Sequence, residues 1–375
     1  ATVMPTSNNK RLRGSKGPNG KGGASGKIRV NSLTQKTAWD SWTSHLEKRR
    51  TPLPIAKVVP NSSVHPLKWA IGDAYFGSAS QELVPVLIKA AGGKRVAIRH
   101  ALEQLASWIE ASESQEPSEA FALECLAWCH ASPVLALECE PSEWVALIDR
   151  IRDIATAAVA IAVQEQPLEH QLLSGELGLT FAYLYPELSG SKKLAKTAER
   201  SLSYGVSELL DGEGLPQSRY LSVFRQLLAC WTRCSVMSGE SGRKCFDSDS
   251  QLQYEWVIRQ TVCLARPDGT QVFSRGSKRD RNTDLIVAAI EHAGDAADEA
   301  AAERALPGQH FKSKSRVEHS LPESSAYSSW GEVCVMRPKW SRKSPLFSAT
   351  WGDRTVNLEL ITSGERLWSD PWKFD

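Results

Sequence analysis

The residues best suited to chemistry follow a single turn, Asp211–Gly212. Gln217, Ser218, Arg219 and Tyr220 come after it and open a segment with helical spacing. Side chains in the first turn of a helix project beside free backbone N–H groups, which favour an anionic ligand. An adjacent arginine stabilises a phenolate, so the pair predicts a Tyr220 pKa below about 10. A tyrosine in that state can exchange a proton with a bound substrate.

A histidine, a basic loop and a tryptophan supply further candidate groups. His170 opens an earlier helical segment and stands next to Glu169. The stretch SRGSKRDR contains Arg275 and Arg279 and could bind a carboxylate or sulfate group. Trp231 is expected mainly as a core residue, although an aromatic face can also stack on a sugar ring.

Each polar candidate also has a structural alternative. Tyr220 could pack its ring at a helix start and leave its hydroxyl in water. His170 could be a structural or solvent-facing histidine. A loop as charged as the one around Arg275 and Arg279 is usually solvated surface. The residue pattern by itself leaves these alternatives open.

Cysteine spacing predicts no metal site. Cys125 and Cys129, and likewise Cys230 and Cys234, are four residues apart within helical patterns, so each pair shares one helix face. His130 adjoins the first pair, but no second ligand pair follows at a suitable spacing. The 8 cysteines in 375 residues are too few for a disulfide scaffold. We therefore expect buried, reduced thiols and neither a metal nor another cofactor.

Helices must position these groups, because apolar residues recur at spacings of three and four through most of the chain. Short connections between long helices make neighbours antiparallel, which is typical of a bundle, a solenoid or an α/α toroid. A sequence repeat of fixed period is absent, which disfavours the solenoid. Glu176, on an otherwise apolar helix face, is expected to pair with an arginine or lysine of a neighbouring helix. The expected helices cover about 79–91, 94–112, 118–130, 142–164, 167–185, 191–210, 217–238, 250–265 and 283–304.

Composition divides the chain into four regions. Residues 1–30 hold seven basic side chains and no acidic one, which predicts a disordered basic tail over residues 1–33. The helical domain is expected over 34–309, and a polar linker over 310–328. Residues 329–375 contain short β-branched and aromatic runs separated by turn residues, which predicts a small β-rich segment.

Bulk properties bound the protein class. Hydrophobic residues make up 41% and charged residues 23%, which is typical of a globular protein. No apolar run approaches the roughly 18 residues of a membrane span. The basic tail could contact RNA, anionic lipid or an acidic glycan. It lacks interleaved aromatic residues, so a solvated tail without a partner is favoured. Nucleic acid is not an expected partner of the rest of the chain. Free cysteines and the lack of a visible signal peptide favour the cytoplasm.

The segments around Glu169–His170 and Asp211–Tyr220 resemble motifs of the heparinase II/III-like family of polysaccharide lyases, which includes some alginate lyases. In that family an Asn-His pair opens one helix, and a loop of the type DG…S.xY precedes the next. Glu169–His170 stands where the pair falls. Asp211–Gly212 with Ser218–Arg219–Tyr220 matches the loop. The resemblance extends over about residues 140–370, including the turn RPDGT at 266–270, and implies an α/α toroid that precedes a β-sandwich.

The resemblance implies β-elimination on a uronic-acid polysaccharide. Arg219, Arg275 or Arg279 would neutralise the C5 carboxylate and make the neighbouring proton more acidic. Tyr220 would donate a proton to the leaving oxygen, and His170 or Tyr220 itself would take the C5 proton. The other expected substrate contacts are Glu169, Gln217 and Trp231. Relatives in this family are usually exported, which would place the chain in the periplasm or outside the cell.

Two departures from the family pattern keep a second function open. Glu169 replaces the asparagine that helps to neutralise the substrate carboxylate, and an acid there would repel a uronate unless it were protonated or turned away. The strand expected at 355–360 lacks the histidine that the family's sandwich often supplies, although Asn357 stands nearby. The alternative to a lyase is therefore a non-catalytic glycan-binding or scaffold protein with the same helical fold.

Overall fold

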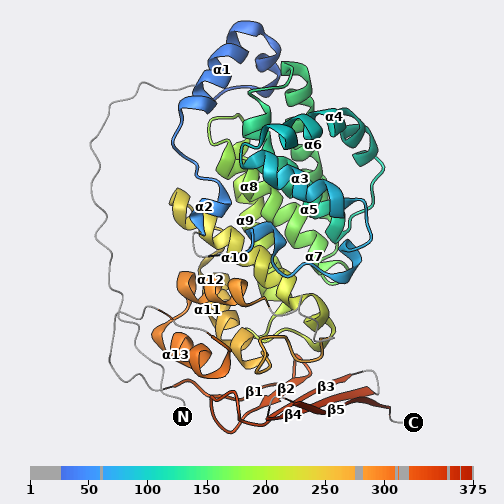
Figure 1. Ribbon diagram of the computed structural model, residues 1–375, viewed down its shortest axis with the longest axis vertical. Coiled ribbons are helices and arrows are strands. Elements are labelled where there is room, and N and C mark those ends of the chain that lie inside the picture. The colour runs from blue at the N-terminus through green and yellow to red at the C-terminus, as the bar shows by residue number, and fades with distance from the viewer. Residues whose placement is uncertain are drawn as a thin grey trace.

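The computed structural model describes residues 27–59, 62–274, 282–308, 311, 321–352, 355–363 and 365–373. Helices make up most of this part, and a sheet follows them (Figure 1). The expected fold class, mainly α with a short β-rich C-terminal segment, is confirmed. The α-helices are α1 (Lys36–Lys48), α2 (Ile55–Val58), α3 (Ser80–Ala91), α4 (Arg95–Ser112), α5 (Glu119–Leu135), α6 (Pro141–Ala157), α7 (Pro167–Glu169), α8 (Gly178–Leu184), α9 (Ser191–Leu209), α10 (Phe224–Ser241), α11 (Ser248–Cys263), α12 (Thr283–Ala293) and α13 (Ala296–Ala305). Other helical turns are η1 (Val30–Thr34), η2 (Pro66–Lys68), η3 (Asp73–Tyr75), η4 (Ala158–Ala160), the π-helix η5 (His170–Leu177) and η6 (Ser218–Val223).

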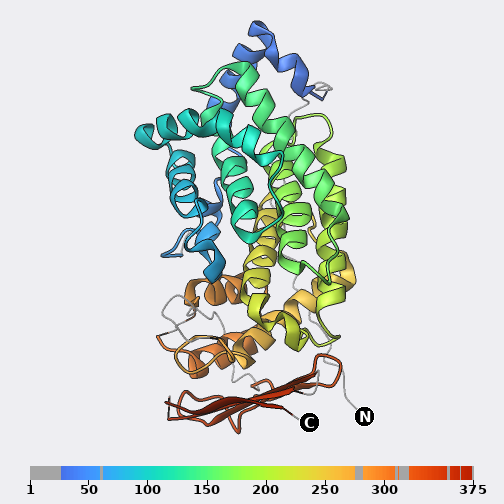
Figure 2. The same ribbon diagram turned by 90° about the vertical axis from the view of Figure 1, so that its right-hand side faces the viewer.

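Long helices stand side by side through the larger part of the molecule, and α11, α12 and α13 lie between them and the sheet (Figures 1 and 2). Tight turns reverse the chain between neighbours. After α10, for example, Gly242 adopts a φ of +65°, a left-handed conformation that suits glycine. No helix of the described residues is both long enough and apolar enough to cross a membrane.

The interior of the helical part contains a charged pair. Glu176 on η5 accepts hydrogen bonds from Arg233 Nε at 2.6 Å and Arg233 Nη2 at 2.7 Å, and both side chains are fully buried. Arg233 Nη1 also donates to the carbonyl oxygen of Pro66 at 3.1 Å. The expectation that Glu176 pairs with a basic residue of a neighbouring helix is confirmed. The pair joins η5, α10 and η2.

A glycine allows α9 to approach η5 closely. Gln171 on η5 donates to the carbonyl oxygen of Ser201 at 2.8 Å and accepts from Trp231 Nε1 at 2.8 Å. A Cβ atom at Gly205 would lie 2.0 Å from Gln171 Nε2, well inside any allowed contact. The buried amide network therefore requires glycine at this position of α9.

The C-terminal sheet has five antiparallel strands in sequence order. Its strands are β1 (Ala326–Ser328), β2 (Val333–Met336), β3 (Leu346–Gly352), β4 (Thr355–Thr362) and β5 (Glu365–Lys373). Alternation along β2 buries Val333 and Val335, whereas Met336 is 53% exposed. Figures 1 and 2 show the sheet lying across one end of the helical part.

Two buried arginines fasten the sheet to the end of α11. Arg266 donates from Nε to Glu359 of β4 at 2.8 Å, and Glu359 also accepts from the backbone N–H of Phe273 at 3.1 Å. Arg337, just after β2, donates to the carbonyl oxygens of Cys263 at 3.3 Å and Ala265 at 2.8 Å. The turn that begins at Arg266 therefore anchors the sheet.

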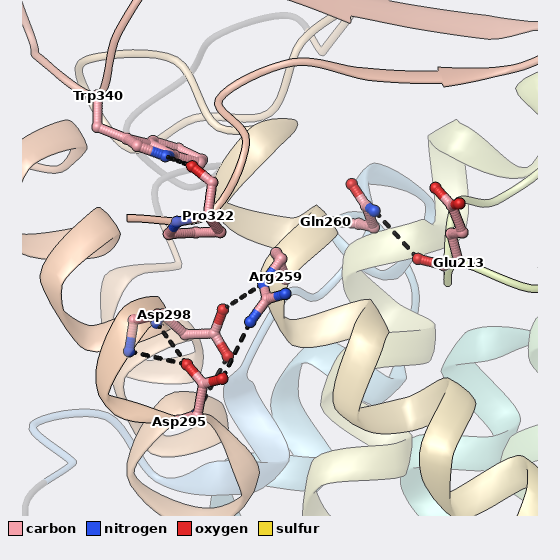
Figure 3. A network of polar contacts seen from close by, with 8 residues as sticks. Glu213, Arg259, Gln260, Asp295, Asp298, Pro322 and Trp340 are labelled. Carbon is pink, nitrogen blue, oxygen red and sulfur yellow. Dashed lines mark hydrogen bonds and ion pairs between the residues drawn. The ribbon is translucent and has the colours of Figure 1, made fainter. Parts of the chain in front are cut away.

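A second polar network holds α11 to its neighbours (Figure 3). Arg259 pairs with Asp298 at 2.8 Å and with Asp295 at 3.0 Å, and these two aspartates form the capping box of α13. Gln260, the next residue, donates to the carbonyl oxygen of Glu213 at 3.0 Å. Consecutive residues of α11 thus contact α13 and the turn that follows α9.

Two domain boundaries differ from those expected. Residues 1–26 of the predicted basic tail lie outside the described residues. The backbone N–H of Ile28 donates to the carbonyl oxygen of Glu187, and the side chains of Val30 and Leu33 are buried. The helical domain therefore begins before residue 34. The predicted linker over 310–328 ends too late, because β1 occupies Ala326–Ser328. Trp340 Nε1 donates to the carbonyl oxygen of Pro322 at 2.7 Å, which ties the chain before β1 to the sheet (Figure 3).

Candidate functional site

The loop after α9 connects the helical part to the sheet. Asp211 Oδ1 accepts from the backbone N–H groups of Glu213 and Leu215, both at 2.9 Å, and so fixes a tight Asx turn. The N–H of Ser218 then donates to the carbonyl oxygen of Gly331 at 2.7 Å. The residues predicted to begin an α-helix form a 3-10 helix instead, and α10 starts at Phe224. This loop holds the first candidate residues against the strands.

A pocket of about 420 Å³ opens at this contact between the two parts. We call it the junction pocket. One wall comes from the loop after α9, and the other comes from β3, β4 and the turn between β1 and β2. Its lining residues are Gln217, Ser218, Arg219, Trp330, Glu332, Thr350, Trp351, Gly352, Thr355 and Asn357. Gln217 and Arg219 were expected substrate contacts, and both line this pocket.

The junction pocket presents a guanidinium group on one wall. Arg219 Nε donates to Gln217 Oε1 at 2.8 Å, and the guanidinium lies 4.6 Å from the centre of the Tyr220 ring. Arg219 is exposed and forms no ion pair with any described residue. Its terminal nitrogens can therefore meet an anionic group of a ligand.

The opposite wall combines indoles with polar groups. Trp330 is 48% exposed, and Trp351 is stacked on Tyr327 with ring centres 5.8 Å apart. Glu332 accepts from the Ser218 hydroxyl at 3.4 Å, and Asn357 donates to Thr350 Oγ1 at 3.2 Å. Flat aromatic faces beside planar hydrogen-bonding groups suit a sugar ring, which has apolar faces and a hydroxylated rim.

Tyr220 does not have the environment expected from its neighbour. It is only 4% exposed, it does not line the junction pocket, and its hydroxyl donates to the carbonyl oxygen of Gln164 at 3.1 Å. Burial raises the pKa of Tyr220, although Arg219 acts in the opposite direction. The predicted pKa below about 10 is therefore wrong, because the loss of hydration outweighs the nearby positive charge.

His170 lies inside the helical part. It is 3% exposed, its Nδ1 accepts from the Gln171 amide at 2.9 Å, and burial lowers its pKa. It therefore favours the neutral form and belongs to the buried network of Gln171. Glu169, the preceding residue, is half-buried. Neither residue lines the junction pocket.

Trp231 is a core residue and not a platform for a sugar. Its side chain is fully buried, and its Nε1 is bonded to Gln171. The expected substrate contact at Trp231 is therefore wrong, because its aromatic face is covered by neighbouring helices. Arg275 and Arg279 lie outside the described residues.

A group of titratable residues around Arg233 was not predicted as a unit from the sequence, although the neighbouring Glu169 was a candidate. It includes Glu119 at the start of α5, together with His65 and His130. Glu119 accepts from the backbone N–H of Gly72 at 2.8 Å, and burial, reinforced by Glu169, raises its pKa to about 7. Burial lowers the pKa of His65 to about 4 and that of His130 to about 3, so both imidazoles are neutral near pH 7. Long sequence separations conceal this cluster.

Replacing Glu119 with glutamine is expected to make stability less sensitive to pH. The pKa is 4.5 for the free group and about 7 in the folded protein. The protonated carboxyl stabilises the fold fully below pH 4.5, and this contribution is lost as pH rises towards 7. Relative to the unsubstituted protein, the free energy of unfolding of E119Q should therefore rise by on the order of 3 kcal/mol between pH 4.5 and 8. Urea denaturation of both proteins at several pH values measures this difference. The titration of His65 and His130 contributes equally to both proteins and therefore cancels. A difference that stays constant with pH would contradict the assignment.

Three buried side chains lie close enough together to bind a metal ion, but their hydrogen bonds and protonation do not suit one. Ligand atoms of Glu176, Cys230 and Cys234 lie within 4.8 Å of one another. Both oxygens of Glu176 are already bonded to Arg233, and burial raises the pKa of both thiols. A cation would have to displace the arginine and deprotonate the thiols. All eight cysteines of the chain are free thiols.

Comparison with known proteins identifies the fold. Searches of the sequence against protein families and against curated proteins give no match. A solved structure of a heparinase III gene product superposes with a TM-score of 0.55 at 12% sequence identity. The alignment covers 91% of this chain but 63% of that one, so this chain spans less than two thirds of the heparinase III structure. This chain therefore shares the α/α-toroid fold of heparinase III, as its sequence motifs predicted. In place of the β-sandwich that the resemblance implied, the described residues form a single antiparallel sheet after the toroid.

Proposed function

We propose that this chain is a polysaccharide lyase-like protein that binds a uronic-acid-containing polysaccharide in the junction pocket. The observation that carries the proposal is the pairing of an exposed guanidinium with two indoles across one pocket. Arg219 would bind the carboxylate of a uronate through its terminal nitrogens. Trp330 and Trp351 would contact the faces of the sugar ring. The fold shared with heparinase III supports a polysaccharide as the ligand class.

Substitutions on the two walls test the binding site. R219Q is expected to weaken binding about tenfold, because it removes one charge-assisted hydrogen bond. W330A is expected to weaken it about three- to tenfold through lost stacking. The measurement is titration calorimetry with alginate, heparin, chondroitin and hyaluronan, and binding through Arg219 should weaken as salt rises.

Two matched variants control for general effects of the substitutions. R200Q removes an exposed arginine of α9, and W256A removes a tryptophan of α11 that is 41% exposed. Neither residue lines the junction pocket. Equal affinities of R219Q and R200Q, or of W330A and W256A, would rule out this site. A failure of all four polysaccharides to bind would overturn the proposed function.

Cleavage by β-elimination is a second candidate function. It is favoured by the contact between Tyr220 and Arg219, which brings a phenol next to the pocket wall. The buried hydroxyl of Tyr220 and its raised pKa favour binding without cleavage. We therefore expect no rise in absorbance near 235 nm, where the double bond of a lyase product absorbs. A rise that is lost in Y220F but kept in R200Q would instead establish cleavage with Tyr220 as the proton carrier.

A further inference from the structure

Arg225, the second residue of α10, carries a buried guanidinium without a counter-charge. The residue is only 5% exposed, and none of its Nε, Nη1 and Nη2 atoms forms a hydrogen bond. No ion pair reaches it from any residue that the structure describes. Burial lowers the pKa of Arg225 to about 10, which leaves the group charged near pH 7. An uncompensated buried charge is strongly destabilising.

The other buried arginines show how this chain normally accommodates such a group. Arg233 is paired with Glu176, and Arg266 is paired with Glu359. Arg337 donates to two backbone carbonyl oxygens. Only Arg225, among the buried arginines of the described ranges, has none of these partners. Its position is therefore unusual even within this protein.

Two contacts show how α10 and α11 run relative to each other. Near the middle of both helices, the Tyr254 hydroxyl of α11 donates to Thr232 Oγ1 of α10 at 3.1 Å. Beyond the end of α11, Gln271 Nε2 donates to the carbonyl oxygen of Leu221, just before α10, at 2.6 Å. The two helices therefore run in opposite directions, with the beginning of α10 beside the end of α11.

This alignment brings a second unpaired group to the level of Arg225. Thr261 lies seven residues after Tyr254, which is two helical turns, and Arg225 lies seven residues before Thr232. Because a hydrogen bond joins those two reference residues, Thr261 and Arg225 lie at about the same level along the two helices. Thr261 is 1% exposed, and its Oγ1 also forms no hydrogen bond. Two buried donors, neither of which has a hydrogen-bond partner, therefore lie near the same end of these helices.

We propose that Arg225 and Thr261 form a buried site for one small monovalent anion between α10 and α11. The guanidinium and the hydroxyl would both donate to the anion, whose single charge balances that of Arg225. Gln271 Oε1, at the same end of the interface, is an acceptor and would face a guanidinium N–H and not the anion. Enclosure by two helices excludes a polysaccharide, so the ligand class is a halide or a compact oxyanion such as nitrate or formate. Arg225 does not line the junction pocket, and this site is separate from it.

Anion-dependent stability tests the proposal. The unfolding equilibrium constant, measured by urea denaturation at fixed ionic strength, should fall as chloride, nitrate or formate replaces the bulky anion gluconate. The fall in this constant should saturate with anion concentration, and it should be about tenfold when the anion is at ten times its dissociation constant. R225M, which removes the charge, should lose this response and should be more stable than the unsubstituted protein in gluconate. R200M, at an exposed arginine of α9, should keep the response in full.

A milder variant and a direct measurement complete the test. T261V removes one donor and leaves Arg225 in place, so the anion should bind several-fold more weakly than in the unsubstituted protein. Crystals soaked in bromide should show an anomalous peak beside the Arg225 guanidinium. Identical anion responses in R225M, R200M and the unsubstituted protein would overturn the proposal. Bromide peaks confined to surface arginines would overturn it as well, even if R225M failed to fold.

Discussion

Replacing Glu176 with glutamine is expected to lower the free energy of unfolding by about 3–5 kcal/mol. Glu176 neutralises Arg233 through two hydrogen bonds of 2.6 and 2.7 Å in a site closed to solvent. Glutamine keeps the shape but leaves the buried arginine without a negative partner. Urea denaturation followed by circular dichroism measures the change.

A surface ion pair supplies the control for E176Q. Arg152 and Asp149 on α6 lie 3.3 Å apart, and their side chains are 34% and 40% exposed. D149N is therefore expected to change the free energy of unfolding by less than about 1 kcal/mol. Similar losses in E176Q and D149N would show that the buried pair has no special role in the helical core.

The second large effect is expected at the contact between the helices and the sheet. E359Q should also cost about 3–5 kcal/mol, because Glu359 is the buried partner of Arg266 and accepts from the Phe273 N–H as well. Phe273 has a φ of +61°, an unfavourable conformation for this residue that the contact helps to hold. E359Q should in addition weaken polysaccharide binding in the junction pocket, since β4 carries one of its walls.

The two substitutions are distinguished by measuring stability and binding together. At a temperature at which both variants are folded, E359Q should bind the polysaccharide more weakly, whereas E176Q should bind it as the unsubstituted protein does. E365Q, the same change at an exposed residue of the adjacent strand β5, should alter neither property. Unchanged binding by folded E359Q would mean that the geometry of the junction pocket does not depend on this ion pair.

Helices were the part of the fold that local sequence could predict. The expected segments at 79–91, 94–112 and 191–210 match α3, α4 and α9 to within one residue at each end. The expected helix at 283–304 is instead divided into α12 and α13, because Asp295 and Asp298 form a capping box that starts a new helix. Apolar spacing continues through that break and conceals it. The first helix, α1, was missed although Trp39, Trp42 and Leu46 provide its buried face.

The candidate site was predicted only as far as neighbouring residues determine it. The loop with Gln217 and Arg219 does line a pocket, because the Asx turn at Asp211 is a local structure. The opposite wall follows more than a hundred residues later, and its position depends on how the sheet packs against the helices. Burial raises the pKa of Tyr220 and makes Trp231 a core residue. The local sequence pattern did not indicate how deeply either side chain is buried. The π-helix η5 was expected as part of an ordinary helix, since its polar residues make their contacts across the core.

The Ser218–Gly331 hydrogen bond has a consequence for selectivity. Together with the arginines that fasten the sheet, it sets the width of the junction pocket before any ligand arrives. A preorganised cleft of this kind costs a ligand little ordering entropy, but it cannot widen to accept a bulkier chain. Discrimination among polysaccharides should therefore depend on the thickness and branching of the chain as much as on its charge.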